Sequence, residues 1–265
     1  MSDASKREAD SAVDENTENL KPWLDRWKKR RIGFHLSDVN PILVQFAKDL
    51  LKLPTTDEKE EKEKEGEEGA CSTARVLVPL CGKTVDMAYL AKISAEVYGV
   101  EGIKTALEEF AEEHADLKIE NKGTVDGFER MEGNKVTLLK GDWFQLSQVQ
   151  TKGQFEAIYD RASMVAIEPA LRKDYVQTVS NLIAKGGILM LVVVERVGPE
   201  EFTKKGPPFT IPESTVQELY GDLDWVESIT KVHQEDQLKD NPAQQERYAG
   251  LDQLLETVYM IQAKK

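Results

Sequence analysis

The amino-acid sequence predicts an α/β fold in which a mostly parallel sheet is flanked by helices. Two observations support this prediction: short apolar runs of strand length alternate with amphipathic helical patterns, and the alternation continues along most of the chain. In such sheets, ligands bind at the carboxyl ends of the strands. The residues that directly follow each apolar run are therefore the first candidates for a functional site.

Residues 75–101 show the pattern most clearly. An apolar run at 76–78 reads as a buried strand, a turn ends at Gly82, a helical pattern follows, and a second run at 96–100 ends on Glu101. A carboxylate about 20 residues after a glycine turn can bind the ribose hydroxyls of a nucleotide. A purely structural βαβ unit without a ligand is the alternative.

Two common phosphate-binding motifs are incomplete in this stretch. A phosphate loop needs a glycine five residues before the Gly82-Lys83 pair, where the chain has Leu77. A dinucleotide site needs three spaced glycines, and only one is present. A pyrophosphate would lack its cradle, whereas a nucleoside without phosphate, such as S-adenosylmethionine, needs none.

The N-terminal part contains a polar tail and then an aromatic segment. We expect residues 1–20, with six acids and two bases, to be a disordered tail. In residues 21–36, Trp23 and Trp27 lie four positions apart, so a helix places them on one face, with Phe34 shortly after. The segment is either a helix docked on the core or a lid over a ligand.

The next helix is predicted to begin at Asn40-Pro41, a favourable cap and first position. An acidic, low-complexity stretch follows, with eight acids and three lysines in residues 57–68. We interpret residues 55–71 as a disordered surface insertion and residues 21–265 as a single domain.

The rest of the chain continues the alternation of helices and strands. A helix from Pro169 is expected to be capped by Gly186-Gly187, and residues 124–135 read as a hairpin or irregular excursion. Further strands are expected at 136–139, 155–159, 188–194, 225–232 and 256–263. The consecutive strand ends predict a convergent cleft lined by four groups: Leu80 to Gly82, Glu101, Asp142 with Trp143, and Asp160 with Arg161.

Composition limits the functional classes. No apolar run approaches the ~20 residues of a membrane helix, and the polar N-terminus lacks the apolar core of a signal peptide. The net charge of −13 lies mainly in residues 1–20 (−4) and 57–68 (−5), and no basic stripe predicts nucleic-acid binding. Two cysteines and three histidines show no zinc spacing, so we expect no metal and a reducing, cytoplasmic location.

Several segments resemble the thiopurine S-methyltransferase family of S-adenosylmethionine-dependent methyltransferases. They are WLDRWKKRRIGFH at 23–35, RVLVPLCGKTVDMAYLA at 75–91, YGVEGI at 98–103, YDRASMVAIEP at 159–169, GPPF at 206–209 and GLDQLLETVY at 250–259. The resemblance implies a doubly wound, mostly parallel, seven-stranded Rossmann-like sheet with helices on both faces and an N-terminal helical lid. The chain departs from relatives at Gly102, where they carry a larger apolar residue, and in its acidic insertion.

The resemblance also implies roles for individual residues. The segment with Trp23, Trp27 and Phe34 would close over the cofactor, with Phe34 also touching the methyl acceptor. The other cofactor contacts would be Leu80 and Gly82 at the methionine portion, Glu101 at the ribose, and Asp142 with Trp143 at the adenine. Arg161 would lie between cofactor and acceptor, and Arg247 is a further candidate for acceptor binding.

The predicted reaction is transfer of a methyl group from S-adenosylmethionine to the sulfur of a small aromatic or heterocyclic thiol, which leaves S-adenosylhomocysteine. Arg161 is expected to favour the anionic acceptor, although it could instead pair with Asp160 or Glu168 and only shape the loop. Two alternatives remain: transfer to small soft anions such as halide, hydrosulfide, selenium or tellurium species, and cofactor binding without catalysis. We expect a monomer with no nucleic-acid or membrane partner.

Overall fold

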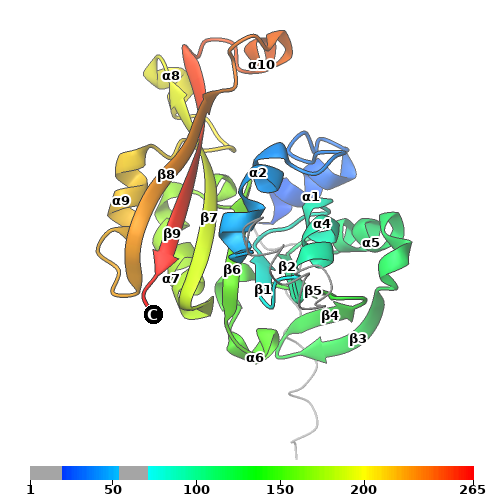
Figure 1. Cartoon of the computed structure of the whole chain (residues 1–265). Helices are drawn as coiled ribbons and strands as arrows, with labels where there is room; N and C mark the ends of the chain where they lie inside the picture. Colours follow the sequence, from blue (N-terminus) through cyan, green and yellow to red (C-terminus); the bar gives the residue numbers. More distant parts are fainter. Residues whose placement is uncertain (1–19, 54–70) are drawn as a thin grey trace, which may run out of the picture. The chain divides into compact units, whose positions relative to one another are not determined.

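The computed structural model describes residues 20–53 and 71–265, so the expected tail at 1–20 and the acidic insertion at 55–71 lie almost wholly outside the described residues. The chain divides into two compact units, residues 1–154 and 155–265. Both are built from strands and helices that alternate along the chain (Figure 1). The single-domain organisation stays a prediction.

The first unit contains five strands in the order β3-β4-β5-β2-β1. Its central strands β1 (Arg75–Val78), β2 (Glu96–Glu101) and β5 (Val136–Lys140) are parallel, as predicted. The hairpin β3 (Glu120–Val125) and β4 (Phe128–Glu132) adds two antiparallel strands beside β5. The described residues therefore hold nine strands in place of the expected seven, because the excursion forms an antiparallel hairpin that pairs with β5.

The helices of the first unit are α1 (Lys21–Lys28), α2 (Pro41–Leu51), α4 (Asp86–Ile93), α5 (Lys104–Glu113) and the short α6 (Gln148–Thr151). The predicted cap of α2 is confirmed, because the Asn40 side chain accepts a hydrogen bond from the Ile42 amide at 2.8 Å. Six apolar side chains of α2 are buried on one face of the helix.

The second unit contains the strands β6 (Phe155–Arg161), β7 (Ile183–Val197), β8 (Val226–Asp236) and β9 (Gln253–Ala263), in the order β6-β7-β9-β8. β6 and β7 are parallel, whereas β9 and β8 run antiparallel to their neighbours. The helices are α7 (Arg172–Leu182), α8 (Glu200–Thr203), α9 (Glu213–Tyr220) and α10 (Pro242–Arg247). α8 and α10 lie together at one end of the long strands (Figure 1).

One boundary prediction in this unit is wrong. Helix α7 ends at Leu182 and β7 already begins at Ile183, so Gly186-Gly187 lie inside the strand and do not cap the helix. The strand accommodates the pair at an irregularity, where the register with β6 shifts between Phe155 and Ala157. A side chain at Gly187 would meet the Ala184 carbonyl oxygen at 2.9 Å, which accounts for a glycine at that point.

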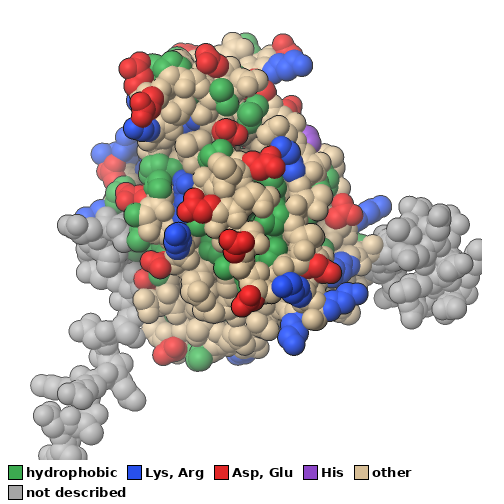
Figure 2. All heavy atoms as spheres, turned by 90° about the vertical axis from the view of Figure 1, so that its left-hand side faces the viewer, with side chains coloured by type: hydrophobic (Ala, Val, Ile, Leu, Met, Phe, Trp, Pro, Cys, Tyr) green, Lys and Arg blue, Asp and Glu red, His purple; other side chains and the backbone are tan. Residues whose placement is uncertain are grey.

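None of the helices within residues 20–53 and 71–265 has the length and apolarity to cross a bilayer. On the face shown in Figure 2, acidic and basic side chains are interspersed. The expectation that nucleic acid is no partner stays a prediction.

Candidate functional site

The loop after β1 adopts an unusual backbone conformation. Leu80 and Gly82 have φ values of 41° and 52°, in the left-handed region, and the Cys81 amide donates to the Val100 carbonyl at 3.0 Å. That bond ties the loop to β2. Glycine is favoured at position 82 by its positive φ, and a Cβ atom there would lie 3.3 Å from the Trp27 ring, which is a tight contact.

Glu101, the last residue of β2, is held in one orientation by the backbone. One carboxylate oxygen accepts from the Gly82 amide at 2.9 Å, and the other accepts from the Ile103 amide, also at 2.9 Å. The residue is only 9% exposed. An ionised carboxylate offers about four acceptor positions, and these two backbone bonds fix its orientation. This arrangement fits a carboxylate that binds a ribose diol.

Cys81 is a packing residue of this loop. Its sulfur would lie 2.8 Å from a Cβ atom at Gly99, so the glycine makes room for the thiol. Burial, assisted by the negative charge of Glu101, raises the pKa of Cys81 well above its usual range. The thiol therefore stays protonated at neutral pH and is a poor nucleophile.

The predicted aromatic segment forms a compact cluster within the first unit. Trp27 is 4% exposed, and its ring covers Gly82. Phe34 meets Trp23 and Trp27 edge to face, with ring centroids 5.8 and 6.2 Å apart. The cluster packs against Ile103, which is two residues after Glu101 and directly before the start of α5. The helix α1 is confirmed, and its role as a lid stays a prediction.

Charged side chains link this segment to α5 and to the Gly82 loop. Arg30 contacts both carboxylate oxygens of Glu109, at 2.6 and 2.7 Å, and Lys83 bonds Glu109 at 3.0 Å and Glu113 at 2.5 Å. Burial lowers the pKa of Lys83, but its bonds to Glu113 and Glu109 outweigh that effect and raise it. Sequence analysis missed this network, because only the spacing of Glu109 and Glu113 on one helix face hinted at it.

The departure at Gly102 has a local explanation. A Cβ atom at this position would lie 2.9 Å from a methyl carbon of Leu20, directly before α1. Leu20 thus occupies the space that a larger residue at position 102 would need. Glycine at position 102 therefore leaves the space in which Leu20 of the N-terminal segment packs.

The end of β5 brings Asp142 and Trp143 to the same region of the first unit. The Gly141 amide donates to the Glu101 carbonyl at 3.0 Å, and the Asp142 carboxylate caps a short 3-10 helix by accepting from the Phe144 amide at 3.0 Å. Asp142 is half-buried, whereas the Trp143 side chain is 2% exposed. Asp142 is thus the more accessible of the two side chains predicted near adenine.

In the second unit, Arg161 is the last residue of β6 and is half-buried. Ala162, directly after it, has a φ of 63°, so the chain turns sharply here. The preceding Asp160 is buried and accepts hydrogen bonds from the Tyr175 hydroxyl at 2.7 Å and the Met164 amide at 3.1 Å. Because neighbouring residues of a strand point to opposite faces, Asp160 anchors the loop on one face and Arg161 lies on the other.

The pH dependence of protein stability tests the burial of the Asp160 carboxyl group. Burial raises the pKa of Asp160 to about 6, against the lowering effect of its hydrogen bonds. A raised pKa in the folded state means that the stability from the bound proton is complete below pH ~4 and is lost as the pH rises through ~6. Asn at this position cannot titrate but can still accept from Met164.

We therefore expect the unfolding free energy of the wild type, relative to Asp160→Asn, to fall by about 2.4 kcal/mol between pH 4 and pH 7. Urea unfolding of both proteins across this range measures the difference. Parallel pH profiles would contradict the raised pKa.

Arg247 ends α10 and is exposed, with its guanidinium 5.5 Å from the centre of the Tyr248 ring. Arg196 of β7 lies 5.4 Å from the same ring and donates to the Phe202 carbonyl at 3.2 Å. Sequence analysis did not select Arg196 or Tyr248. The polar Glu195-Arg196 pair after the apolar run of β7 was the available signal.

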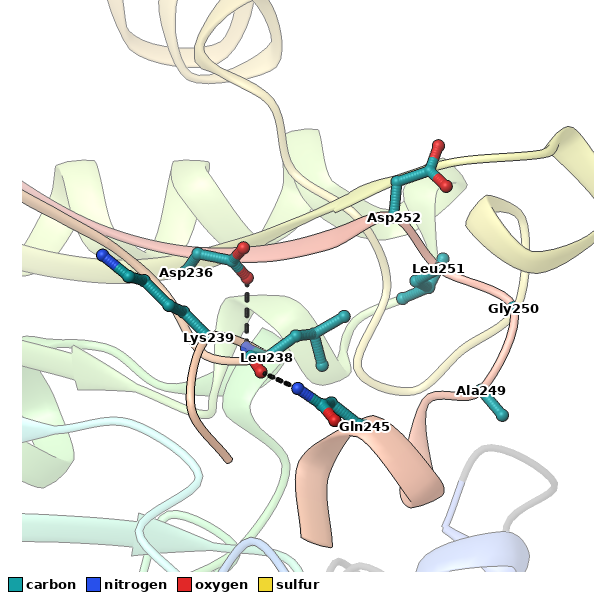
Figure 3. A pocket seen from close by; sticks show the side chains of 8 residues that line it. All are labelled: Asp236, Leu238, Lys239, Gln245, Ala249, Gly250, Leu251 and Asp252. Carbon is teal, nitrogen blue, oxygen red and sulfur yellow. Dashed lines mark hydrogen bonds between the residues drawn. The ribbon is translucent and has the colours of Figure 1, made fainter. Parts of the chain in front are cut away.

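A polar pocket of about 380 Å³ lies beside this region, between the end of β8 and the chain that leads into β9 (Figure 3). The Asp236 carboxylate accepts from the Leu238 amide at 3.0 Å, and the Gln245 side chain donates to the Leu238 carbonyl at 2.8 Å. The pocket contains none of the predicted site residues. All of its lining residues come from the end of β8 and its connection to β9, residues 236–252.

Comparisons with solved structures identify the fold. The mixed sheet resembles the YcgJ protein of Bacillus subtilis, with a TM-score of 0.51, 14% identity and coverage of 80% of this chain and 99% of that one. It also resembles CrArsM, an arsenic(III) S-adenosylmethionine methyltransferase from Chlamydomonas reinhardtii, with a TM-score of 0.50, 16% identity and coverage of 81% and 72%. The fold is that of the Rossmann-like methyltransferases.

The sequence comparisons identify the family. A family model described as Thiopurine S-methyltransferase (TPMT) matches residues 66–264. A thiopurine S-methyltransferase of Pseudomonas aeruginosa strain UCBPP-PA14 is 35% identical over 91% of this chain and 97% of its own length. One from Vibrio cholerae strain O395 is 32% identical over 91% and 96%. The chain belongs to the thiopurine S-methyltransferase family and is an S-adenosylmethionine-dependent methyltransferase.

Proposed function

We propose that the protein methylates the sulfur of a small aromatic or heterocyclic thiol. The observation that carries the proposal is the Glu101 carboxylate, which the Gly82 and Ile103 amides orient beside Trp27. A buried, oriented carboxylate of this kind can recognise the ribose of S-adenosylmethionine. The names of the relatives support sulfur as the methylated atom.

The residues of the first unit are proposed to bind the cofactor. Bound S-adenosylmethionine supplies an electrophilic methyl group on a sulfonium. Glu101 accepts hydrogen bonds from the ribose hydroxyls, and aromatic rings exclude water from the charged sulfur. The proposed cofactor contacts are Trp23, Trp27, Phe34, Leu80, Gly82, Glu101, Asp142, Trp143 and Arg161.

Arg161 is proposed to hold the acceptor. A guanidinium favours the anionic form of a nearby acid, so it lowers the pKa of a thiol and increases the thiolate fraction at neutral pH. Fixing the sulfur in line with the methyl group supplies much of the rate, because the reaction then needs no further orientation. Phe34 and Arg247 stay predicted acceptor contacts.

A product assay with several acceptors tests this proposal. The purified chain is incubated with methyl-labelled S-adenosylmethionine and, separately, aromatic thiols, a selenol, hydrosulfide and iodide. We expect methylation of the aromatic thiols to be fastest. Fastest turnover with iodide or hydrosulfide would assign the enzyme to small soft anions, and cofactor binding without any product would contradict methyl transfer to these acceptors.

Arg161 is tested in the same assay. Arg161→Gln is expected to lower kcat/KM for an aromatic thiol by about 10²-fold, and Arg161→Lys should recover part of the loss, because the charge is restored without the planar fork. Lys231→Gln, which removes a positive charge from an exposed ion pair on β8, is the matched control. Equal activity of Arg161→Gln and the wild type would remove Arg161 from the acceptor site.

We further propose a monomeric protein that acts in the cytoplasm on a small molecule. Both cysteines are free thiols, Cys71 exposed and Cys81 buried, which suits a reducing compartment.

A further inference from the structure

The strand register of the second unit gathers charged residues on one face of the sheet. Arg161 of β6 pairs with Val192 of β7, and Val194, two residues further along β7, pairs with Glu256 of β9. Residues that pair across strands, and residues two apart on one strand, share a face. Arg161 and Glu256 therefore lie on the same face of the sheet, opposite to Asp160.

The neighbouring strands complete the set of charges on this face. Glu235 of β8 pairs with Glu256, and His233 pairs with Val258, two residues along β9. Arg196 pairs with Leu254, two residues away in the other direction. The face thus carries two carboxylates, one histidine and two arginines.

Glu256 is fixed on this face by a hydrogen bond and interacts electrostatically with Arg161. Its carboxylate accepts a hydrogen bond from the Gln237 side chain at 3.1 Å, and the residue is half-buried. Burial raises the pKa of Glu256, while Arg161 opposes this shift, Glu235 adds to it and His233 reduces it. The charges of Arg161 and Glu256 are thus close enough to influence each other.

We propose that Glu256 is a positioning and specificity residue that offsets the charge of Arg161 and so disfavours acceptors carrying a second negative group. This inference rests on the proposed role of Arg161 as the acceptor residue. A thiol whose only charge is on the reacting sulfur needs one cation. A thiol that also carries a carboxylate meets an arginine already compensated by Glu256, with Glu235 beside it.

The test compares two acceptors of similar size, 4-methylbenzenethiol and 4-mercaptobenzoate. The measured quantity is the ratio of their KM values, mercaptobenzoate over methylbenzenethiol. Glu256→Gln is expected to lower this ratio about tenfold, the size of one charge interaction of moderate strength. Glu256→Asp retains the charge and should keep the ratio near that of the wild type.

Glu235→Gln is the matched control. It removes the paired carboxylate on β8, which is exposed and lies 3.8 Å from a ring nitrogen of His233. Its expected effect on the ratio is less than twofold. A lower ratio in Glu235→Gln equal to that in Glu256→Gln would show a general charge effect and overturn the specific pairing.

The pH profile adds a readout that a purely structural role would not change. As the pH falls and Glu256 takes up a proton, the KM ratio of the wild type should fall toward that of Glu256→Gln, while the ratio in Glu256→Gln should vary less. If Glu256→Gln has the same KM ratio as the wild type, the proposal is overturned. The same holds if the substitution changes the KM values of both thiols by the same factor.

Binding separates this inference from the proposed function. Calorimetry of 4-mercaptobenzoate in the presence of S-adenosylhomocysteine needs no turnover. Glu256→Gln is expected to bind this anion about tenfold more tightly than the wild type. Equal dissociation constants would overturn the role of Glu256 even if both thiols are methylated, whereas tighter binding without methylation would contradict the reaction alone.

Discussion

Replacing Glu101 with alanine is expected to weaken S-adenosylmethionine binding by roughly tenfold to a hundredfold, because charge-assisted hydrogen bonds of about 1.5–3 kcal/mol are lost. Alanine also leaves the Gly82 and Ile103 amides without their carboxylate, so the loop itself should loosen. Isothermal calorimetry with S-adenosylmethionine measures the affinity, and thermal unfolding measures the loop contribution separately.

Two further variants make the Glu101 result specific. Glu101→Gln keeps the shape and one acceptor oxygen, so it should bind more tightly than the alanine variant but less tightly than the wild type. Glu96→Gln is the control, because Glu96 begins the same strand and forms an exposed ion pair with Arg75 at 3.1 Å. An unchanged dissociation constant in Glu101→Ala would remove this residue from the cofactor site.

Replacing Trp27 with alanine is expected to cost about 3–5 kcal/mol of packing within the N-terminal cluster. The side chain is 4% exposed and covers Gly82, so the change uncovers the loop that orients Glu101. Cofactor affinity and turnover should both fall, because water enters the site and the alignment of the reacting groups loosens. Trp27→Phe keeps an aromatic ring and should retain most of both.

Hydrogen exchange of residues 21–36 distinguishes the two interpretations of this segment. A lid should gain protection when S-adenosylhomocysteine is added, and its ordering should make the heat capacity of binding more negative. Trp27→Ala should lose protection in both conditions. Equal protection of the wild-type segment with and without cofactor would show a permanently docked helix, held by Trp27 and by the Arg30–Glu109 pair.

Much of the fold could be predicted because local patterns and burial agree. The seven expected strands and the cap at Asn40 are confirmed, since apolar runs between turn residues have few other stable arrangements. The C-terminal boundary of α7 was harder to predict. Two adjacent glycines suit a helix cap and a strand irregularity equally well, and the choice depends on the pairing of β7 with β6.

The sequence by itself determined the fold class, the family and the position of the key carboxylate at the end of a strand. It did so because the alternation of strands and helices places consecutive strand ends at one edge, and because Gly82 and Glu101 are spaced as a βαβ unit requires. These features depend on residues near one another in the chain.

Only the tertiary structure decided which groups meet across long separations. The contact of Trp27 with Gly82, the bond of Arg30 to Glu109 and the sharing of one sheet face by Arg161 and Glu256 each join distant segments. No periodicity encodes such pairs, because they arise from how helices dock and from the register between strands. A shift of register by one residue would move Glu256 to the opposite face of the sheet.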